Sequence, residues 1–201
     1  MPCTTIDLYS NIEDCLGAKV LPGARAHAYF IKKANIAAWP VLGDPEDEDA
    51  TLESIATYDG DFTLAAGKYW HKIDLRENVN GITSEPQGEI GSKSFSDTAT
   101  LVHSGTSAEA AGMAAQMNND DVVFAIPMRN GKIRILGNQA FRTQVGVSLD
   151  TGKAATDAAS TSIEAKVDSE VPAPYYPGKL MLSATTYIDG SDDTEKTLPA
   201  S

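Results

Sequence analysis

Cysteine and histidine are scarce in this sequence. The 201 residues include two cysteines, Cys3 and Cys15, which do not form a Cys-x-x-Cys pair. Two cysteines are too few for a disulfide scaffold and suit a protein that matures in a reducing cytosol. The three histidines, His27, His71 and His103, lie in three separate predicted strands, whereas a zinc site needs several ligands that converge. We therefore interpret each histidine as a surface residue of its strand.

Motifs for nucleophilic catalysis and for phosphate binding are also missing. The sequence contains no Gly-x-Ser-x-Gly elbow and no P-loop that ends in Gly-Lys-Ser or Gly-Lys-Thr. Acidic residues are numerous, but a catalytic pair cannot be chosen among them without geometry. We therefore assign no catalytic residue, no cofactor-binding residue and no metal ligand, expect no cofactor, and predict that the protein is not an enzyme.

The sequence also lacks long apolar runs and an excess of basic charge. No run approaches the length of a membrane-spanning helix, and the first residues, MPCTTIDLYS, lack the basic and apolar regions of a signal peptide. We therefore predict a soluble protein, made inside the cell, that makes no membrane contact. Sixteen basic residues against twenty-eight acidic ones give a net charge of −12, which argues against DNA binding through phosphate contacts.

Two acidic segments raise the question of calcium, because hard cations prefer carboxylate oxygens. Residues 44–49 read Asp-Pro-Glu-Asp-Glu-Asp, and residues 189–193 read Asp-Gly-Ser-Asp-Asp. The first segment lacks the EF-hand spacing and its central glycine, so a solvated loop is favoured over a calcium site. The second segment is interpreted as part of a polar C-terminal tail.

The part of the sequence with the clearest pattern begins with a helix over residues 107–117. Thr106 is placed to act as the N-cap, and Glu109, three residues later, completes a capping box. Small apolar residues, mostly alanine, recur at helical spacing on one face. Such a face can pack closely against a sheet, so the helix is predicted to have a structural role.

A β-hairpin is predicted directly after this helix, in the segment VVFAIPMRNGKIRIL. Asn130-Gly131 accepts positive φ at both central positions, which favours a two-residue turn. That turn predicts a register in which the opposed pairs are Met128 with Ile133 and Ile126 with Ile135. Pro127 cannot donate a ladder hydrogen bond, so the first strand is expected to be an edge there or to carry a bulge.

Alternation of apolar and polar residues predicts further strands over residues 141–149 and 161–167. Shorter patterns predict strands at 24–32, 69–75, 95–101 and 180–188, and a short pair, 52–58 with 62–64. One face of each strand is apolar and the other polar, as in an antiparallel β-sandwich or barrel with one flanking α-helix. The predicted buried face contains Phe124, Ile126, Ile133, Ile135, Val145, Val147, Ile163 and Val167.

A single domain over residues 1–201 is predicted, because no repeat or composition shift divides the chain. Four segments lack periodicity or carry residues that break strands. They are interpreted as an N-terminal arm (residues 1–22), a long loop (77–94), an extended proline-rich loop (171–178) and a C-terminal tail (189–201). Residues 44–50, the long loop and the tail are expected to be mobile or extended in an isolated subunit.

Several of these features, in this order, resemble the major tail protein, or tail tube protein, of long-tailed bacteriophages and prophages. The resemblance is strongest to the versions carried by phages of gut Bacteroides-type bacteria, and it covers about residues 105–178. The segments that carry it follow the helix, and they are DDVVF (120–124), RILGN (134–138), SLDTG (148–152), TSIE (161–164) and PAPYY (172–176).

The resemblance implies a structural virion protein, made in the host cytoplasm and located in the phage tail. Its subunits are expected to form hexameric rings that stack into a tube, with strands from all subunits joined in one inner barrel. The partners would be further copies of this chain and other tail proteins, such as the tape measure and the tail terminator. DNA would pass through the lumen as non-specific cargo.

Two other classes of function remain open from the residues alone. One is a different virion component, such as a head decoration or tail completion protein. The other is a surface binding module of sandwich type, against which the missing signal peptide counts. Assembly distinguishes these classes, because a tube protein polymerises and a binding module stays monomeric.

Overall fold

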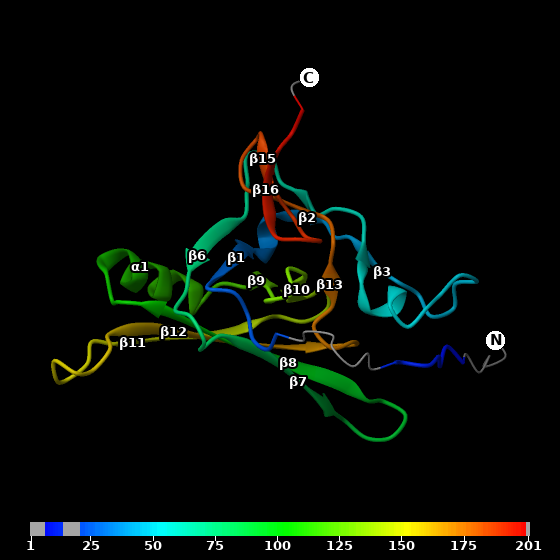
Figure 1. The fold of residues 1–201 in the computed structure, drawn as a ribbon, viewed down its shortest axis with the longest axis horizontal. Coiled ribbons are helices and arrows are strands. Elements are labelled where there is room, and N and C mark those ends of the chain that lie inside the picture. The colour runs from blue at the N-terminus through cyan, green and yellow to red at the C-terminus, as the bar shows by residue number, and fades with distance from the viewer. Residues whose placement is uncertain (1–6, 14–20, 200–201) are drawn as a thin grey trace.

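The computed structural model describes residues 7–13 and 21–199, and Figure 1 shows their arrangement. Both cysteines and much of the predicted N-terminal arm, residues 1–22, lie outside the described residues. The described part is mainly β, with several antiparallel sheets and a single α-helix, as predicted. Its sheets do not close into a barrel, so the sandwich is the form that the fold takes.

A five-stranded sheet lies at the centre of the molecule. Its order is β13-β10-β9-β1-β6, and each neighbouring pair is antiparallel. The strands are β1 (His27–Lys32), β6 (His71–Asp74), β9 (Val122–Pro127), β10 (Ile133–Leu136) and β13 (Tyr175–Tyr176). Every residue of β9 is buried, because β9 is an inner strand and both faces of this sheet are covered.

A four-stranded antiparallel sheet packs on one face of the central sheet. Its order is β11-β12-β8-β7. The strands are β7 (Gly81–Gln87), β8 (Ser94–Ser104), β11 (Gln144–Asp150) and β12 (Ser160–Ser169). In Figure 1 this sheet is the longest feature, with the β11–β12 hairpin projecting at one end and the β7–β8 hairpin at the other.

Smaller elements cover the opposite face of the central sheet. A three-stranded sheet joins β14 (Lys179–Met181), β15 (Thr186–Asp189) and β16 (Thr194–Thr197). Two short pairs join β2 (Ile36–Ala38) with β5 (Thr63–Leu64) and β3 (Val41–Leu42) with β4 (Tyr58–Asp59). Two 3-10 turns, η1 (Lys33–Asn35) and η2 (Ser54–Ala56), complete this layer.

Two apolar cores follow from this layering. The first lies between the two large sheets and contains Phe124 and Ile126 of β9 together with Ile163 of β12. The second lies on the other face of the central sheet and contains Ile133 and Ile135 of β10 with aromatic side chains of the small elements. The predicted buried residues are buried as expected, except Val145 and Val147 on the outer strand β11, which are partly buried.

The helix α1 (Ala108–Met117) confirms the predicted helix. Its N-cap is Ser107 rather than Thr106, and the Ser107 hydroxyl accepts the amide of Ala110 at 3.2 Å. Ala110, Ala114 and Met117 are its buried residues. Alanine at these positions lets the helix approach the sheet closely, which is the structural role that the sequence indicates.

The predicted register of the β9–β10 hairpin is wrong by one residue. Ile133 pairs with Pro127, and Arg134 pairs with Ile126. The turn has three residues rather than two, because the Met128 amide donates to the Lys132 carbonyl and Gly131 alone adopts positive φ (+91°). The slip places Phe124 and Ile126 of β9 in the first core and Ile133 and Ile135 of β10 in the second. Pro127 needs neither an edge nor a bulge, since β9 ends there between two partners.

Two segments that were predicted to be irregular contain strands. Residues 77–94 include all of β7, which pairs with β8 along its length. Residues 189–201 include β16, which closes a hairpin with β15. Both strands are mostly polar and show no apolar pattern. They are specified instead by backbone hydrogen bonding to the neighbouring strand.

Three smaller predictions also need correction. The segments 52–58 and 62–64 do not pair with each other, because β4 pairs with β3 and β5 pairs with β2. The proline-rich segment 171–178 contains β13, which adds two residues to the central sheet. The predicted last strand, 180–188, is divided between β14 and β15.

Candidate assembly surface and buried polar sites

The four-stranded sheet has one apolar face and one polar face. Ala99, Leu101, Ile163 and Ala165 of its inner strands face the first core. Serine and threonine predominate on the opposite face. Its charged residues, placed by strand alternation, are Glu85, Asp150, Glu164, Lys166 and Asp168. This face therefore has an excess of acidic groups and presents no array of cations that could hold a nucleic acid backbone.

The β7 edge of this sheet has backbone groups that no described strand pairs. The Val102 amide of β8 donates to the Asn80 side chain, on the β7 side, so even-numbered residues of β8 point toward β7. Their partners in β7 are the odd-numbered residues. Backbone groups of successive strand residues point to opposite sides, so Ile82 and Ser84 direct theirs away from the sheet. Pro86 is the third outward residue and has no N–H to leave unpaired.

The β11 edge at the other side is partly capped. The same alternation directs the odd-numbered residues of β11 outward. The Val147 amide donates to Asn118 Oδ1 at 2.7 Å, and the Thr143 amide, just before the strand, donates to Asp121 Oδ1 at 3.0 Å. Asn118 is the C-cap residue of α1. The end of the helix and the residues after it therefore occupy this edge with side-chain acceptors.

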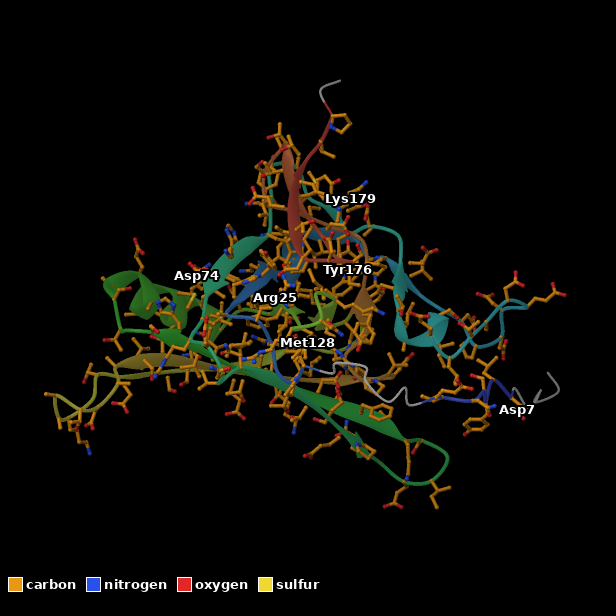
Figure 2. The ribbon with its side chains drawn as sticks, in the orientation of Figure 1. Asp7, Arg25, Asp74, Met128, Tyr176 and Lys179 are labelled. Carbon is orange, nitrogen blue, oxygen red and sulfur yellow. The ribbon has the colours of Figure 1, made fainter. Side chains whose placement is uncertain are left out.

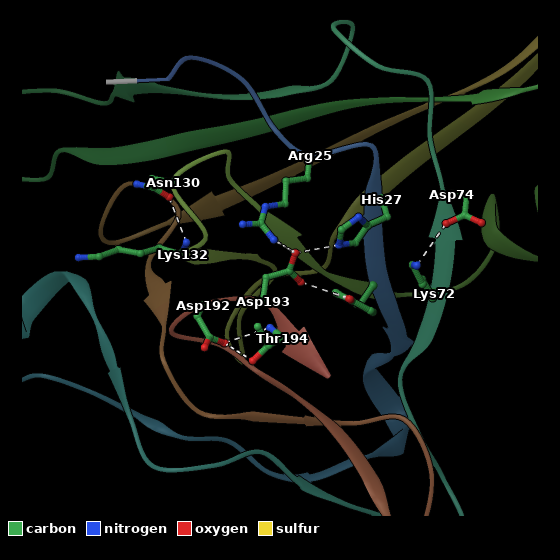
Figure 3. Close-up of polar contacts among 10 residues, drawn as sticks. Arg25, His27, Lys72, Asp74, Asn130, Lys132, Asp192, Asp193 and Thr194 are labelled. Atoms are coloured by element: carbon green, nitrogen blue, oxygen red, sulfur yellow. Dashed lines mark hydrogen bonds and ion pairs between the residues drawn. The ribbon is translucent and has the colours of Figure 1, made fainter. Parts of the chain in front are cut away.

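A buried aspartate joins the C-terminal hairpin to β1 (Figure 3). The Asp193 side chain has no exposed surface, and its Oδ2 lies 2.7 Å from Arg25 Nη1 and 2.9 Å from His27 Nε2. Its Oδ1 accepts the Tyr29 hydroxyl at 3.2 Å. Burial, followed by the carboxylate of Asp193, raises the pKa of Tyr29, so the phenol stays protonated and donates. In Figure 2, Arg25 lies near the centre of the molecule, far from Asp7 of the N-terminal segment.

The same hairpin carries a second, more exposed polar cluster. Lys196 Nζ lies 2.6 Å from Asp189 Oδ2, and the Ser191 hydroxyl donates to Asp189 Oδ1 at 2.5 Å. The hydrogen bond from Lys196 is the main cause that lowers the pKa of Asp189 to about 2, and the bond from Ser191 adds to it. These contacts are local to residues 189–196, so their role is to hold the turn between β15 and β16.

A cavity of about 380 Å³ lies beside the start of β8 and the end of β12. Asp97 of β8 lines it and is 1% exposed. The Ser169 hydroxyl and the Ala173 amide donate to Asp97 Oδ2 at 2.5 and 3.0 Å, whereas Oδ1 has no partner among the described residues. Tyr58 also lines the cavity, and its burial, with a smaller contribution from the Glu170 carboxylate, raises the pKa of its phenol to about 12.

The residues considered for metal binding are dispersed in the structure. His27 contacts Asp193, His71 stacks against Phe30, and His103 Nδ1 lies 2.6 Å from the Asp74 carbonyl. Residues 44–49 form a loop of turns, and the described residues contain no group of three or more ligands that could hold a metal ion. Calcium therefore gains no support. Sequence reasoning missed Asp193, which it assigned to a solvated tail.

Comparison with protein-family models, with curated proteins and with solved structures finds no match to this chain. Among the described residues, no helix has the length and hydropathy needed to cross a bilayer. The features of the molecule that bear on its function are therefore the sheet edges, the polar face and the buried polar groups.

Proposed function

We propose that this chain is a structural subunit that self-associates into stacked rings, as in the tail tube of a bacteriophage virion. The observation that carries the proposal is the four-stranded sheet, which has at β7 an edge that no described strand pairs and a second outer strand, β11, at its opposite side. An unpaired edge is a template for another strand. A contact between two different edges of one sheet is heterologous and forms a ring when the rotation closes.

In the proposed ring, β7 of one copy pairs with β11 of the next, and the sheets form one continuous wall. The apolar face stays against each subunit's own core, so the polar face lines the lumen. An acidic, serine- and threonine-rich wall suits a channel that conducts DNA, because it offers no counterion release to a phosphate backbone. The hexameric order, the tape-measure and tail-terminator partners and the tail location are expectations from the resemblance.

Sedimentation and negative-stain imaging of concentrated protein test the assembly, and two substitutions test its geometry. Ser84→Pro removes an outward N–H from β7 and should weaken association, whereas Ser84→Ala keeps the N–H and should associate like the unmodified chain. Asn118→Ala frees the Val147 amide and should strengthen association, whereas Asn118→Asp keeps an accepting oxygen. Circular dichroism establishes that each variant is folded.

Three results would contradict the proposal. The first is a monomer at every concentration and salt level, as for a surface binding module. The second is a closed dimer that does not grow, which indicates an isologous contact. The third is an effect of the same direction from Ser84→Pro and Asn118→Ala. Rings that form but do not stack would favour another virion component, such as a head decoration or tail completion protein.

A further inference from the structure

The cavity beside Asp97 is lined by apolar side chains and by the buried carboxyl group of Asp97. Its apolar lining residues include Trp39, Leu42, Ile135 and Val167. Val41 and Phe141, which also line it, are 71% and 44% exposed, although both are large apolar side chains. A concave, mostly apolar site with a few convergent polar groups is typical of a ligand-binding cleft.

The charge of the lining is of one sign. Asp97 and Glu170 line the cavity, and no lysine, arginine or histidine of the described chain does. A cation beside the lining is Lys33, whose Nζ donates to the Phe141 carbonyl at 2.8 Å and lies 3.6 Å from the Asp121 carboxylate. Lys33 is therefore already paired with an acid outside the cavity, and the lining favours a cationic occupant.

The hydrogen bonds of Asp97 narrow the chemistry of that cation. A carboxylate has about four acceptor positions, and the two donors that Asp97 has among the described residues both contact Oδ2. One free oxygen suits the point charge of a primary ammonium better than the planar fork of a guanidinium, which binds two oxygens together. Trp39, Tyr58 and Phe141 supply aromatic and apolar surface for an alkyl stem.

From these observations we propose that the cavity is a binding site for a primary ammonium group on a short alkyl stem, with Asp97 Oδ1 as its acceptor. No residue of β7 or β11 lines this site, although Asp97 pairs with Ser84 of β7. The proposal does not depend on ring assembly. Such a group is present both in a free alkylamine and in the lysine side chain of a second copy of this chain.

The proposal is tested by titrating the protein with n-pentylammonium and following the amide NMR shifts of Gly137 and Val171, which line the cavity. We expect saturable shifts with n-pentylammonium, weaker binding of n-pentyltrimethylammonium, which has no N–H to donate, and no binding of pentanoate. Asp97→Asn should weaken n-pentylammonium binding by about tenfold. Asp168→Asn, on the polar face of the same sheet, should leave it unchanged.

A second variant, at the rim of the cavity, tests the proposal even if Asp97→Asn does not fold. Val41→Lys changes an exposed side chain and places a competing ammonium at the mouth, so it should also weaken n-pentylammonium binding. The proposal is overturned if pentanoate or the quaternary ammonium binds as tightly as n-pentylammonium. It is also overturned if the folded Asp97→Asn variant, or the Val41→Lys variant, binds with unchanged affinity.

A protein concentration series without probe separates the two sources of the ligand. Shifts of the same amides with protein concentration alone identify a lysine of a second copy, and shifts with added n-pentylammonium alone identify a free amine. Each of these results supports the site, whereas no shift in either series overturns it.

Discussion

Among single residues, Asp193 has partners from a strand at the opposite end of the sequence. Asp193→Ala would leave Arg25, His27 and Tyr29 without their common acceptor in a largely buried position. We expect a loss of about 3 kcal/mol in the free energy of unfolding, measured by urea denaturation, because removing one partner strands the others. Asp193→Asn should lose less, since its amide oxygen still accepts and asparagine tolerates the positive φ (59°) at this position.

The neighbouring Asp192 provides the control for this prediction. Its side chain is 48% exposed, and it accepts the amide and hydroxyl of Thr194. Asp192→Asn keeps an accepting oxygen and should change the free energy of unfolding by less than about 0.5 kcal/mol. Equal losses in Asp192→Asn and Asp193→Ala would show that the buried cluster contributes no more to the free energy of unfolding than an exposed turn does.

At the scale of elements, the β9–β10 turn depends on Gly131. Its φ of +91° lies in the region that favours glycine, and an added Cβ would lie 3.4 Å from the Arg25 guanidinium and from the Asp192 carbonyl. Gly131→Ala should therefore lower the free energy of unfolding by about 1–2 kcal/mol. Gly112→Ala in α1 is the matched control and should raise it by about 0.5–1 kcal/mol, because the helix gains a better former and the added Cβ meets nothing within 4 Å.

The β15–β16 hairpin should respond to acid through Asp189. Its pKa is lowered from 3.8 to about 2 in the folded chain, so the folded state holds its proton more weakly than the unfolded state does. The stabilisation from Asp189 is therefore complete above pH 4 and is lost as the pH falls toward 2. Denaturation midpoints measured from pH 6 to pH 2 should fall less steeply in Asp189→Asn than in the unmodified chain. Parallel curves for the two proteins would contradict this assignment.

Some elements could be predicted from the sequence and others could not. Strict alternation predicted β11 and β12, a shorter apolar pattern predicted β8, and the alanine spacing predicted α1, because one face of each is buried against a single core. The central sheet is covered on both faces, so both faces of β9 are apolar. The sequence around Pro127 therefore does not indicate which residues face which core. The strands β7 and β16 are specified by backbone pairing with a neighbouring strand. The role of Asp193 could not be predicted, because its partners lie 164 to 168 positions earlier, in β1 and just before it.

At the scale of the whole molecule, the net charge of −12 should control the proposed self-association. Acidic subunits repel one another at low ionic strength, and salt screens charges beyond roughly 8 Å at physiological strength. We therefore expect the assembled fraction in sedimentation to rise as salt is added, and a mobility-shift assay to show no tight binding of duplex DNA. Assembly that weakens with salt, or tight DNA binding, would be inconsistent with an acidic subunit interface and lumen.

The contact between Asp193 and β1 has a consequence for how the protein is made. A ribosome releases Arg25, His27 and Tyr29 long before Asp193, since 168 positions separate Arg25 from Asp193. The buried cluster therefore cannot form until Asp193 has been translated, and a nascent chain that stops before it lacks the shared acceptor of three side chains. Because contacts of such high sequence separation form slowly, we expect this cluster to be completed late in folding.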